Sequence, residues 1–184
     1  MADKWKVLKS EKVFDCPWFK VVQETCTLPN GRIIDDYFVT ESADIVTIIP
    51  FIDKNHLILL KEYKHGYGDY IYTFPSGIIE KNESPLKAAK RELFEETGYN
   101  GKLFKLVTTH PNPTSSRFKK TTFIATDLTK VGMQKLDKTE FIQVYIKSLS
   151  EIFDLIDKNK ISSDLNLFSF YQALRHLKMM EIKY

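Results

Sequence analysis

The order of the predicted elements along the 184 residues indicates an α+β fold, in which helices cover a mixed β-sheet. Three observations predict it. Strand patterns fill most of the first half of the chain. One sharply bounded helix follows them, and the second half returns to strands before ending in two helices. A chain of this length can bury a substantial core without splitting into several domains.

The composition argues against several classes of protein. A hydrophobic content of 43% and an aromatic content of 13% are typical of a globular protein. The net charge is only +3, with both signs interspersed, which argues against a dedicated nucleic-acid or membrane binder. No apolar run approaches the roughly 20 residues of a membrane span, and the first ten residues lack the apolar core of a signal peptide. We therefore expect a cytoplasmic protein in which Cys16 and Cys26 stay reduced.

Residues 1–45 are predicted to form an antiparallel β region that precedes the main domain, residues 46–184. Phe19–Leu28 is rich in β-branched residues, the turn sequence PNG follows, and Arg32–Val39 returns. Two such runs around an Asn-Gly turn predict a hairpin.

The central strands are predicted from apolar runs. Asp44–Phe51 and His56–Tyr63 are almost continuously apolar, as strands buried on both faces are. A short strand over Ile71–Phe74 leads into the turn sequence PSG. After the first helix, strand patterns recur over Lys102–Thr108, Thr121–Thr126 and Phe141–Ile146.

The first helix is predicted from its two ends. Ser84 is a favourable N-cap with proline directly after it, and Gly98 can end the helix in the left-handed conformation. Leu86, Ala89 and Leu93 make an apolar stripe between these ends.

Two further helices are predicted near the C-terminus. Ser148 and Glu151 have the spacing of a capping box and open the first of them. The second covers Leu165–Met180. Its expected core-facing residues are Leu167, Phe170, Tyr171, Leu174 and Leu177.

Three carboxylates crowd onto the first predicted helix, at Glu92, Glu95 and Glu96. Like charges three or four residues apart destabilise a helix by roughly 0.2–0.5 kcal/mol per pair. A hard divalent cation is the natural partner of such a group. Glu92 and Glu96 lie on the flank of the apolar stripe, Glu95 lies on the other side of it, and Arg91 is within reach. An isolated E-x-x-E-E pattern is more often a solvated helix face, so the carboxylates alone leave both interpretations open.

The whole segment from Gly77 to Tyr99, GIIEKNESPLKAAKRELFEETGY, resembles the Nudix box of the Nudix hydrolases, with every fixed position filled. The resemblance implies an α-β-α sandwich and hydrolysis of a pyrophosphate bond with Mg²⁺, for which Mn²⁺ could substitute. It implies that the metal is held by Glu92, Glu95, Glu96 and the backbone carbonyl of Ser76. Arg91 would orient one of these glutamates. Glu83 is equally compatible with a role in the site and with an ordinary charge near a helix N-terminus.

The segments LLKEYKHGYGDYIYTFPSG and THPNPTSSRFKKTTFIATDL are similar to parts of ADP-ribose and nucleotide-sugar pyrophosphatases. This likeness implies a nucleoside diphosphate-linked substrate such as ADP-ribose, split into a nucleoside monophosphate and a sugar phosphate. The chain departs from those relatives at three places, of which one is Ser76-Gly77, where they usually carry Ala-Gly. Glu-Tyr-Lys stands at 62–64 where they usually carry Gln-Tyr-Arg, and TSSR follows the matching proline where they often have glycine and an acidic residue.

The candidate substrate contacts outside the box are of three kinds. Trp18 and Tyr67 could stack on a nucleobase, although aromatic residues are more often part of a core. Lys64 stands where the relatives usually have arginine, and Pro113 matches a proline of the relatives. Arg117, together with the lysines at 119 and 120, could bind a phosphate or could form a solvated basic loop.

The general base is expected in the loop before the last predicted strand, where relatives often carry it. Asp137 and Glu140 are the acidic candidates, and Glu140 matches the family pattern better. The N-terminal region is also similar to the one through which ADP-ribose pyrophosphatases form an intertwined homodimer, so we expect a homodimer. Two other functions stay open. One is hydrolysis of NADH, a diadenosine polyphosphate or an oxidised nucleotide, and the other is a non-catalytic Nudix domain that senses a ligand.

Overall fold

The computed structural model describes residues 3–180 and divides them into two compact units. The first comprises residues 3–44 and the loop 109–119, and the second comprises residues 45–108 and 120–180. The predicted α+β class is confirmed, since both units contain sheets and the second adds three helices. Among the described residues, no helix is long and apolar enough to cross a membrane.

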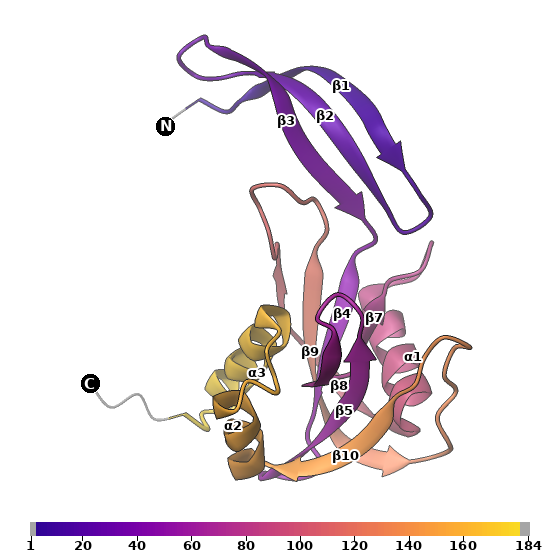
Figure 1. The fold of residues 1–184 in the computed structure, drawn as a ribbon. Coiled ribbons are helices and arrows are strands. Elements are labelled where there is room, and N and C mark those ends of the chain that lie inside the picture. The colour runs from indigo at the N-terminus through magenta and orange to yellow at the C-terminus, as the bar shows by residue number, and fades with distance from the viewer. Residues whose placement is uncertain (1–2, 181–184) are drawn as a thin grey trace. The chain divides into compact units, whose positions relative to one another are not determined.

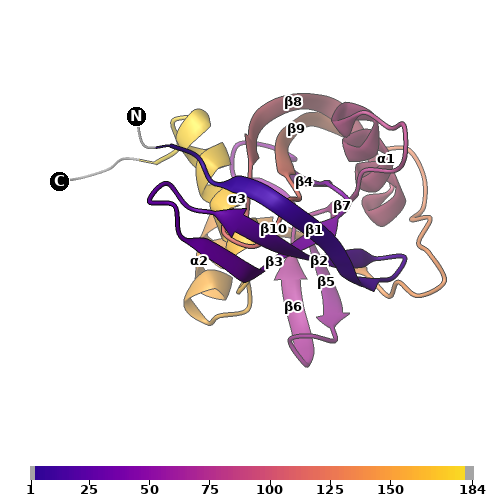
Figure 2. The same ribbon diagram turned by 90° about the horizontal axis from the view of Figure 1, so that it is seen from above.

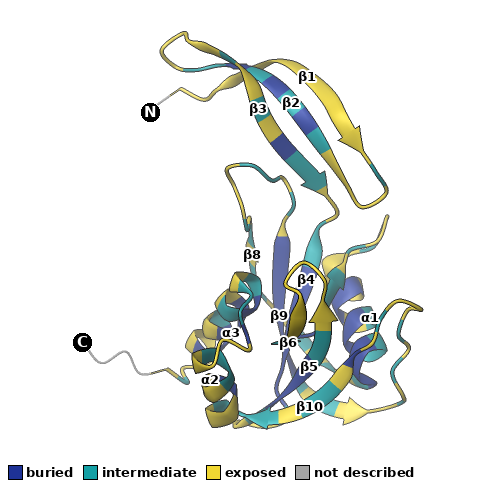
Figure 3. Ribbon diagram, in the orientation of Figure 1, coloured by how far each residue is buried: buried dark blue, intermediate teal, exposed yellow. Residues whose placement is uncertain are grey.

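The first unit contains a three-stranded antiparallel sheet in the order β1-β2-β3 (Figure 1). The predicted hairpin is present as β2 (Phe19–Thr27) and β3 (Ile33–Ser42), with Val22 opposite Val39. β1 (Lys6–Asp15) was not predicted from the sequence, and all of its residues are exposed (Figure 3). An edge strand without a buried face has no need of the apolar alternation from which strands are predicted.

A mixed four-stranded sheet forms the centre of the second unit. β4 (Ile45–Pro50) runs parallel to β9 (Lys120–Lys130) and antiparallel to β7 (Ser76–Ile78), and β8 (Tyr99–Thr109) completes the order β7-β4-β9-β8. The prediction missed β7 because its residues, Ser-Gly-Ile, have the composition of a turn.

A second sheet of this unit has β5 (His56–Lys64) in its middle. β6 (Asp69–Thr73) and β10 (Gln143–Ser148) flank it, and both run antiparallel to it. The strands that were predicted over these segments are all present, with their ends displaced by a few residues.

The helices cover both sides of the four-stranded sheet. α1 (Pro85–Thr97) lies on one side, and α2 (Leu149–Asp157) and α3 (Asp164–His176) lie on the other (Figures 1 and 2). Alternate side chains of β4 point to opposite faces of the sheet and pack against the helices on each face. Val46 packs with the α1 cluster and Ile49 with the cluster under α2 and α3. The expected α-β-α sandwich is therefore confirmed.

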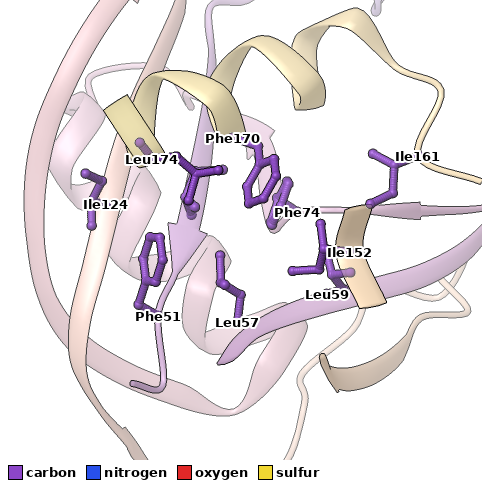
Figure 4. Packing of buried hydrophobic residues seen from close by; sticks show 11 residues of the cluster. Phe51, Leu57, Leu59, Phe74, Ile124, Ile152, Ile161, Phe170 and Leu174 are labelled. Carbon is purple, nitrogen blue, oxygen red and sulfur yellow. The ribbon is translucent and has the colours of Figure 1, made fainter. Parts of the chain in front are cut away.

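The larger core lies under α2 and α3 (Figure 4). The rings of Phe74 and Phe170 stack at its centre, with 5.6 Å between their centroids. Its buried members are Ile49, Phe51, Leu57, Leu59, Phe74, Ile124, Ile152, Ile161, Phe170, Ala173 and Leu174.

Three expected core positions were wrong. Leu86 is 43% exposed, because it lies in the first turn of α1 and the buried face begins two residues later, at Ala88. In the last helix, Tyr171 and Leu177 are more than a third exposed. α3 also ends at His176 and not at Met180, so Leu177 lies past its last turn.

Candidate active site

Local sequence fixes both ends of α1, as predicted. The Ser84 hydroxyl accepts a hydrogen bond from the N–H of Lys87, and Gly98 ends the helix with φ of 76°. Gly98 has a second constraint, since a Cβ there would lie 2.3 Å from the carbonyl oxygen of Gly132. The helix that carries the carboxylates is therefore fixed to the loop beyond β9.

Arg91 gathers three carboxylates around its guanidinium. Nε and Nη2 donate to the two oxygens of Glu83, at 3.1 and 3.0 Å. Nη1 donates to Oε1 of Glu92 at 2.7 Å and to Oε2 of Glu95 at 3.1 Å, and Nη2 also reaches the carbonyl oxygen of Ile78 at 3.0 Å. These charge-assisted bonds raise the pKa of Arg91 and use one oxygen each of Glu92 and Glu95. Glu83, ambiguous in the sequence, is the bidentate partner of Arg91.

Glu96 is the most deeply buried carboxylate of the group, with 5% of its surface exposed. Its Oε2 accepts a hydrogen bond of 2.9 Å from the backbone N–H of Ser76 at the start of β7. Burial raises the pKa of Glu96 well above its usual value, and the like charges of Glu92, Glu62 and Glu140 raise it further. Carboxylates from α1, from β5 and from the loop before β10 are therefore close enough to act on Glu96 through their charges.

Glu92 lies against the backbone of β7. A Cβ on Gly77 would be 1.9 Å from its Oε1, so only glycine leaves room for the carboxylate in this position. Burial raises the pKa of Glu92, while the adjacent Arg91 opposes that shift.

The loop between β9 and β10 is tied to the end of α1. The Gln134 amide donates to the carbonyl oxygen of Glu96 at 2.7 Å and to that of Ile142 at 3.2 Å. The N–H of Lys135 donates to the carbonyl oxygen of Glu95 at 2.8 Å. Gln134 was missed because its partners are backbone atoms, which leave no mark on the sequence pattern.

Glu140 lies in this loop, near the carboxylates. Its carboxylate accepts a hydrogen bond of 3.0 Å from the N–H of Asp137, and its charge raises the pKa of both Glu92 and Glu96. Asp137 itself is exposed. Of the two acids considered as a base, Glu140 is the one whose charge reaches the box.

The carboxylates have the chemistry needed to bind a cation, but their oxygens do not surround a single point. Within residues 3–180, no three acidic, histidine or cysteine side chains converge closely enough to chelate an ion as they stand. Arg91 holds one oxygen of Glu92 and one oxygen of Glu95. Glu92 and Glu96 are nevertheless buried acids with raised pKa values, and a cation would compensate their charge. An all-oxygen donor set of this kind suits Mg²⁺ or Mn²⁺.

Lys64 and Tyr67 belong to the β5–β6 hairpin of the same unit. Lys64 pairs with Glu62 at 2.8 Å, and Tyr67 is 50% exposed in the turn. Glu62 also accepts a hydrogen bond of 3.0 Å from the Thr73 hydroxyl. The sequence indicated a possible role for Glu62 only because Glu62 stands where the relatives usually have glutamine.

Trp18, Pro113 and Arg117 belong to the first unit. Trp18 is 79% exposed, and Pro113 is also exposed. Arg117 is paired with Glu24 and Glu41, which differs from the free phosphate-binding cation that was expected.

The expected exposed position of Lys120 was wrong. The side chain is 1% exposed under α3, where its ammonium donates to the Ser169 hydroxyl at 2.8 Å and to the carbonyl oxygen of Leu165. Burial lowers its pKa to about 8. A lysine in this position cannot bind substrate phosphate from solution.

Comparison with known proteins agrees with this geometry. The NUDIX domain family matches residues 42–179, and the nucleoside diphosphate sugar hydrolase N-terminal domain family matches residues 5–40. The ADP-ribose pyrophosphatase of Bacillus subtilis (strain 168) is 26% identical over 178 residues, which are 96% of this chain and 94% of that protein. The ADP-sugar pyrophosphatase of Mus musculus is 37% identical over 110 residues, 54% of this chain and 50% of that protein. A crystal structure of an ADP compounds hydrolase matches with a TM-score of 0.84 at 26% identity and covers 97% of each chain.

Proposed function

Since the chain belongs to the Nudix family, we propose that it hydrolyses the pyrophosphate bond of a nucleoside diphosphate-linked substrate. The proposed substrate is ADP-ribose or another nucleotide sugar, and the products are a nucleoside monophosphate and a sugar phosphate. Relatives named ADP-ribose pyrophosphatase and ADP-sugar pyrophosphatase support this class of substrate, as does the match of residues 5–40 to the nucleoside diphosphate sugar hydrolase N-terminal domain.

The observation that carries the proposal is the carboxylate group assembled around Arg91. The box keeps its glutamates, and the guanidinium holds Glu83, Glu92 and Glu95 beside the buried Glu96. A domain that only sensed a ligand would have no need of a buried, mutually repelling group of acids, which is costly to maintain.

Glu92, Glu95, Glu96 and the carbonyl of Ser76 would hold the divalent metal, for which we propose Mg²⁺, with Mn²⁺ as a possible substitute. A bound metal supplies charge neutralisation of the diphosphate and acidification of a water. Arg91 fixes the direction of the Glu92 and Glu95 carboxylates through their hydrogen-bonded oxygens. The N–H of Ser76 does the same for Glu96.

Proton transfer is assigned to Glu140. It is anchored by the Asp137 N–H, and its charge reaches Glu92 and Glu96. A carboxylate in this position can accept the proton of the attacking water.

Trp18, Lys64, Tyr67 and Pro113 remain the proposed substrate contacts. The exposed rings of Trp18 and Tyr67 offer surfaces for a nucleobase. The cytoplasmic location and the homodimer expected from the sequence also remain predictions.

A substrate screen tests the proposal. Nucleotide sugars, NADH and diadenosine polyphosphates are each incubated with the protein and Mg²⁺, and phosphate is measured after a phosphatase chase that acts only on phosphomonoesters. We expect the highest kcat/KM with ADP-ribose or another nucleotide sugar. A preference for NADH or a diadenosine polyphosphate would favour the other hydrolase function. Tight ligand binding without turnover would favour the sensor.

A further inference from the structure

The loop 109–119 connects β8 to β9, yet it packs on the N-terminal sheet as part of the first unit. Its backbone pairs with β3. The N–H of Thr40 donates to the carbonyl oxygen of Ser115 at 2.8 Å, and the N–H of Arg117 donates to the carbonyl oxygen of Thr40 at 3.0 Å. The Tyr37 hydroxyl adds a hydrogen bond to the carbonyl oxygen of Thr114. The loop is therefore an additional edge of the sheet at this point.

Arg117 joins two strands of the sheet to this loop. Nη2 donates to Oε1 of Glu24 in β2 at 2.7 Å, and Nη1 donates to Oε1 of Glu41 in β3 at 2.6 Å. Glu24 is only 5% exposed, and a buried carboxylate is costly without a cationic partner. The two acids raise the pKa of Arg117. A guanidinium engaged in this way is part of the framework and is not free to bind a phosphate.

Glu41 connects this ion pair to Trp18, whose side chain is 79% exposed in the turn between β1 and β2. A hollow of about 280 Å³ lies beside the Trp18 ring, and Glu41 lines it together with Pro17, Lys20, Ser42 and Ala43. One carboxylate thus belongs both to the ion-pair network and to the wall of this hollow.

We propose that Arg117 is a positioning residue for nucleotide binding. It holds the Glu41 carboxylate at the hollow beside Trp18 and fixes the loop that carries Pro113. The proposal rests on the proposed function, because it takes the ligand of the hollow to be a nucleoside monophosphate, which is a product of the proposed reaction. A base stacked on Trp18 would leave its ribose hydroxyls near a carboxylate, which is the acceptor that they prefer.

The effect of losing Arg117 should fall on binding and not on chemistry. The metal-binding acids and Glu140 belong to the second unit, and Arg117 makes none of their hydrogen bonds. We therefore expect the Arg117→Gln variant to raise KM for ADP-ribose about 10-fold and to change kcat less than about threefold.

Binding of AMP gives a readout that does not depend on hydrolysis. The chain has two tryptophans, so Trp5→Phe leaves Trp18 as the only tryptophan, whose fluorescence then reports binding. In this background we expect Arg117→Gln to weaken AMP binding about 10-fold, and Arg117→Lys to restore part of the affinity. Arg32→Gln, at an exposed arginine of the same unit, is the matched control and should leave AMP affinity unchanged.

If Arg117→Gln unfolds the sheet, its loss of affinity says nothing about positioning, and Glu41→Gln then provides the test. It removes the charge at the hollow and leaves the pair of Arg117 with the buried Glu24 in place. We expect a native melting temperature and an AMP affinity reduced about fivefold or more.

The outcomes separate the two proposals. If AMP affinity is unchanged in both Arg117→Gln and Glu41→Gln, or if kcat collapses while KM stays constant, Arg117 is not a positioning residue. If ADP-ribose is not hydrolysed but AMP binding depends on Arg117, the positioning role stands and the proposed reaction fails. If the wild-type protein does not bind AMP, the positioning role is overturned as well.

Discussion

Oε1 of Glu92 occupies the space that a side chain on Gly77 would need, since a Cβ there would lie 1.9 Å from it. The clash involves the end of a flexible side chain, so Gly77→Ala should displace the carboxylate and leave the fold intact. The displaced Glu92 would lose its bond to Arg91. We expect kcat/KM to fall about 10–100-fold, the range for lost support of a metal ligand, with a melting temperature within a few degrees of wild type.

Gly66→Ala is the matched control for this variant. A Cβ on Gly66 meets nothing within 4 Å, so its activity should equal that of the wild type. An unchanged kcat/KM in Gly77→Ala would mean that the position of Glu92 is unimportant.

Replacing Glu140 tests the assignment of the base. Glu140→Gln keeps the size of the side chain and removes its ability to accept a proton. We expect kcat to fall by about 10²–10⁴ with little change in KM, because general-base catalysis contributes about this much. Steady-state kinetics of Asp137→Asn provide the comparison, and a reduction of less than about threefold is expected. A larger loss in Asp137→Asn than in Glu140→Gln would reverse the assignment.

Because Lys120 is buried with a lowered pKa, we predict that the free energy of unfolding depends on pH. Burial lowers its pKa from 10.5 to about 8 in the folded chain. Between these values the unfolded chain binds more protons, so the free energy of unfolding should rise with pH through this window. Because the pKa is lowered, the buried charge reduces the free energy of unfolding by about 3 kcal/mol at pH 7.

Lys120→Met should therefore stabilise the protein, by about 1–3 kcal/mol at pH 7. The groups left behind keep partners, since the carbonyl oxygen of Leu165 still accepts from Ser169 and the Ser169 hydroxyl still meets Thr122. Urea unfolding at pH 7 and pH 10 measures the effect, and the gain should shrink at the higher pH. A loss of stability at pH 7 would show that the hydrogen bonds of the ammonium outweigh the cost of burying it.

The features that could be predicted are those set by neighbouring residues. Ser84 and Gly98 fix the ends of α1 through bonds within one helical turn, and Ser148 forms the predicted capping box with Glu151. The box glutamates could be placed for the same reason, because helical geometry alone puts Glu92 and Glu96 on one flank.

The features that were missed depend on contacts between distant parts of the chain. Arg117 and Glu24 are 93 residues apart in sequence, and no local pattern indicates that they pair. Lys120 follows a basic loop in sequence, yet the packing of α3 on β9 buries it. Glu62 in β5 acts through its charge on Glu96 in α1, and no local pattern indicates that these two residues lie near each other.

The most direct test of the metal-dependent hydrolysis is the turnover of ADP-ribose by Glu96→Gln across a Mg²⁺ titration. A glutamine oxygen can still accept the N–H of Ser76, and loss of a buried charge should not destabilise the fold. We predict Mg²⁺-dependent release of AMP by the wild-type protein and a rate lower by about 100-fold or more in the folded variant. Turnover at the wild-type rate, with the same dependence on Mg²⁺, would contradict the account.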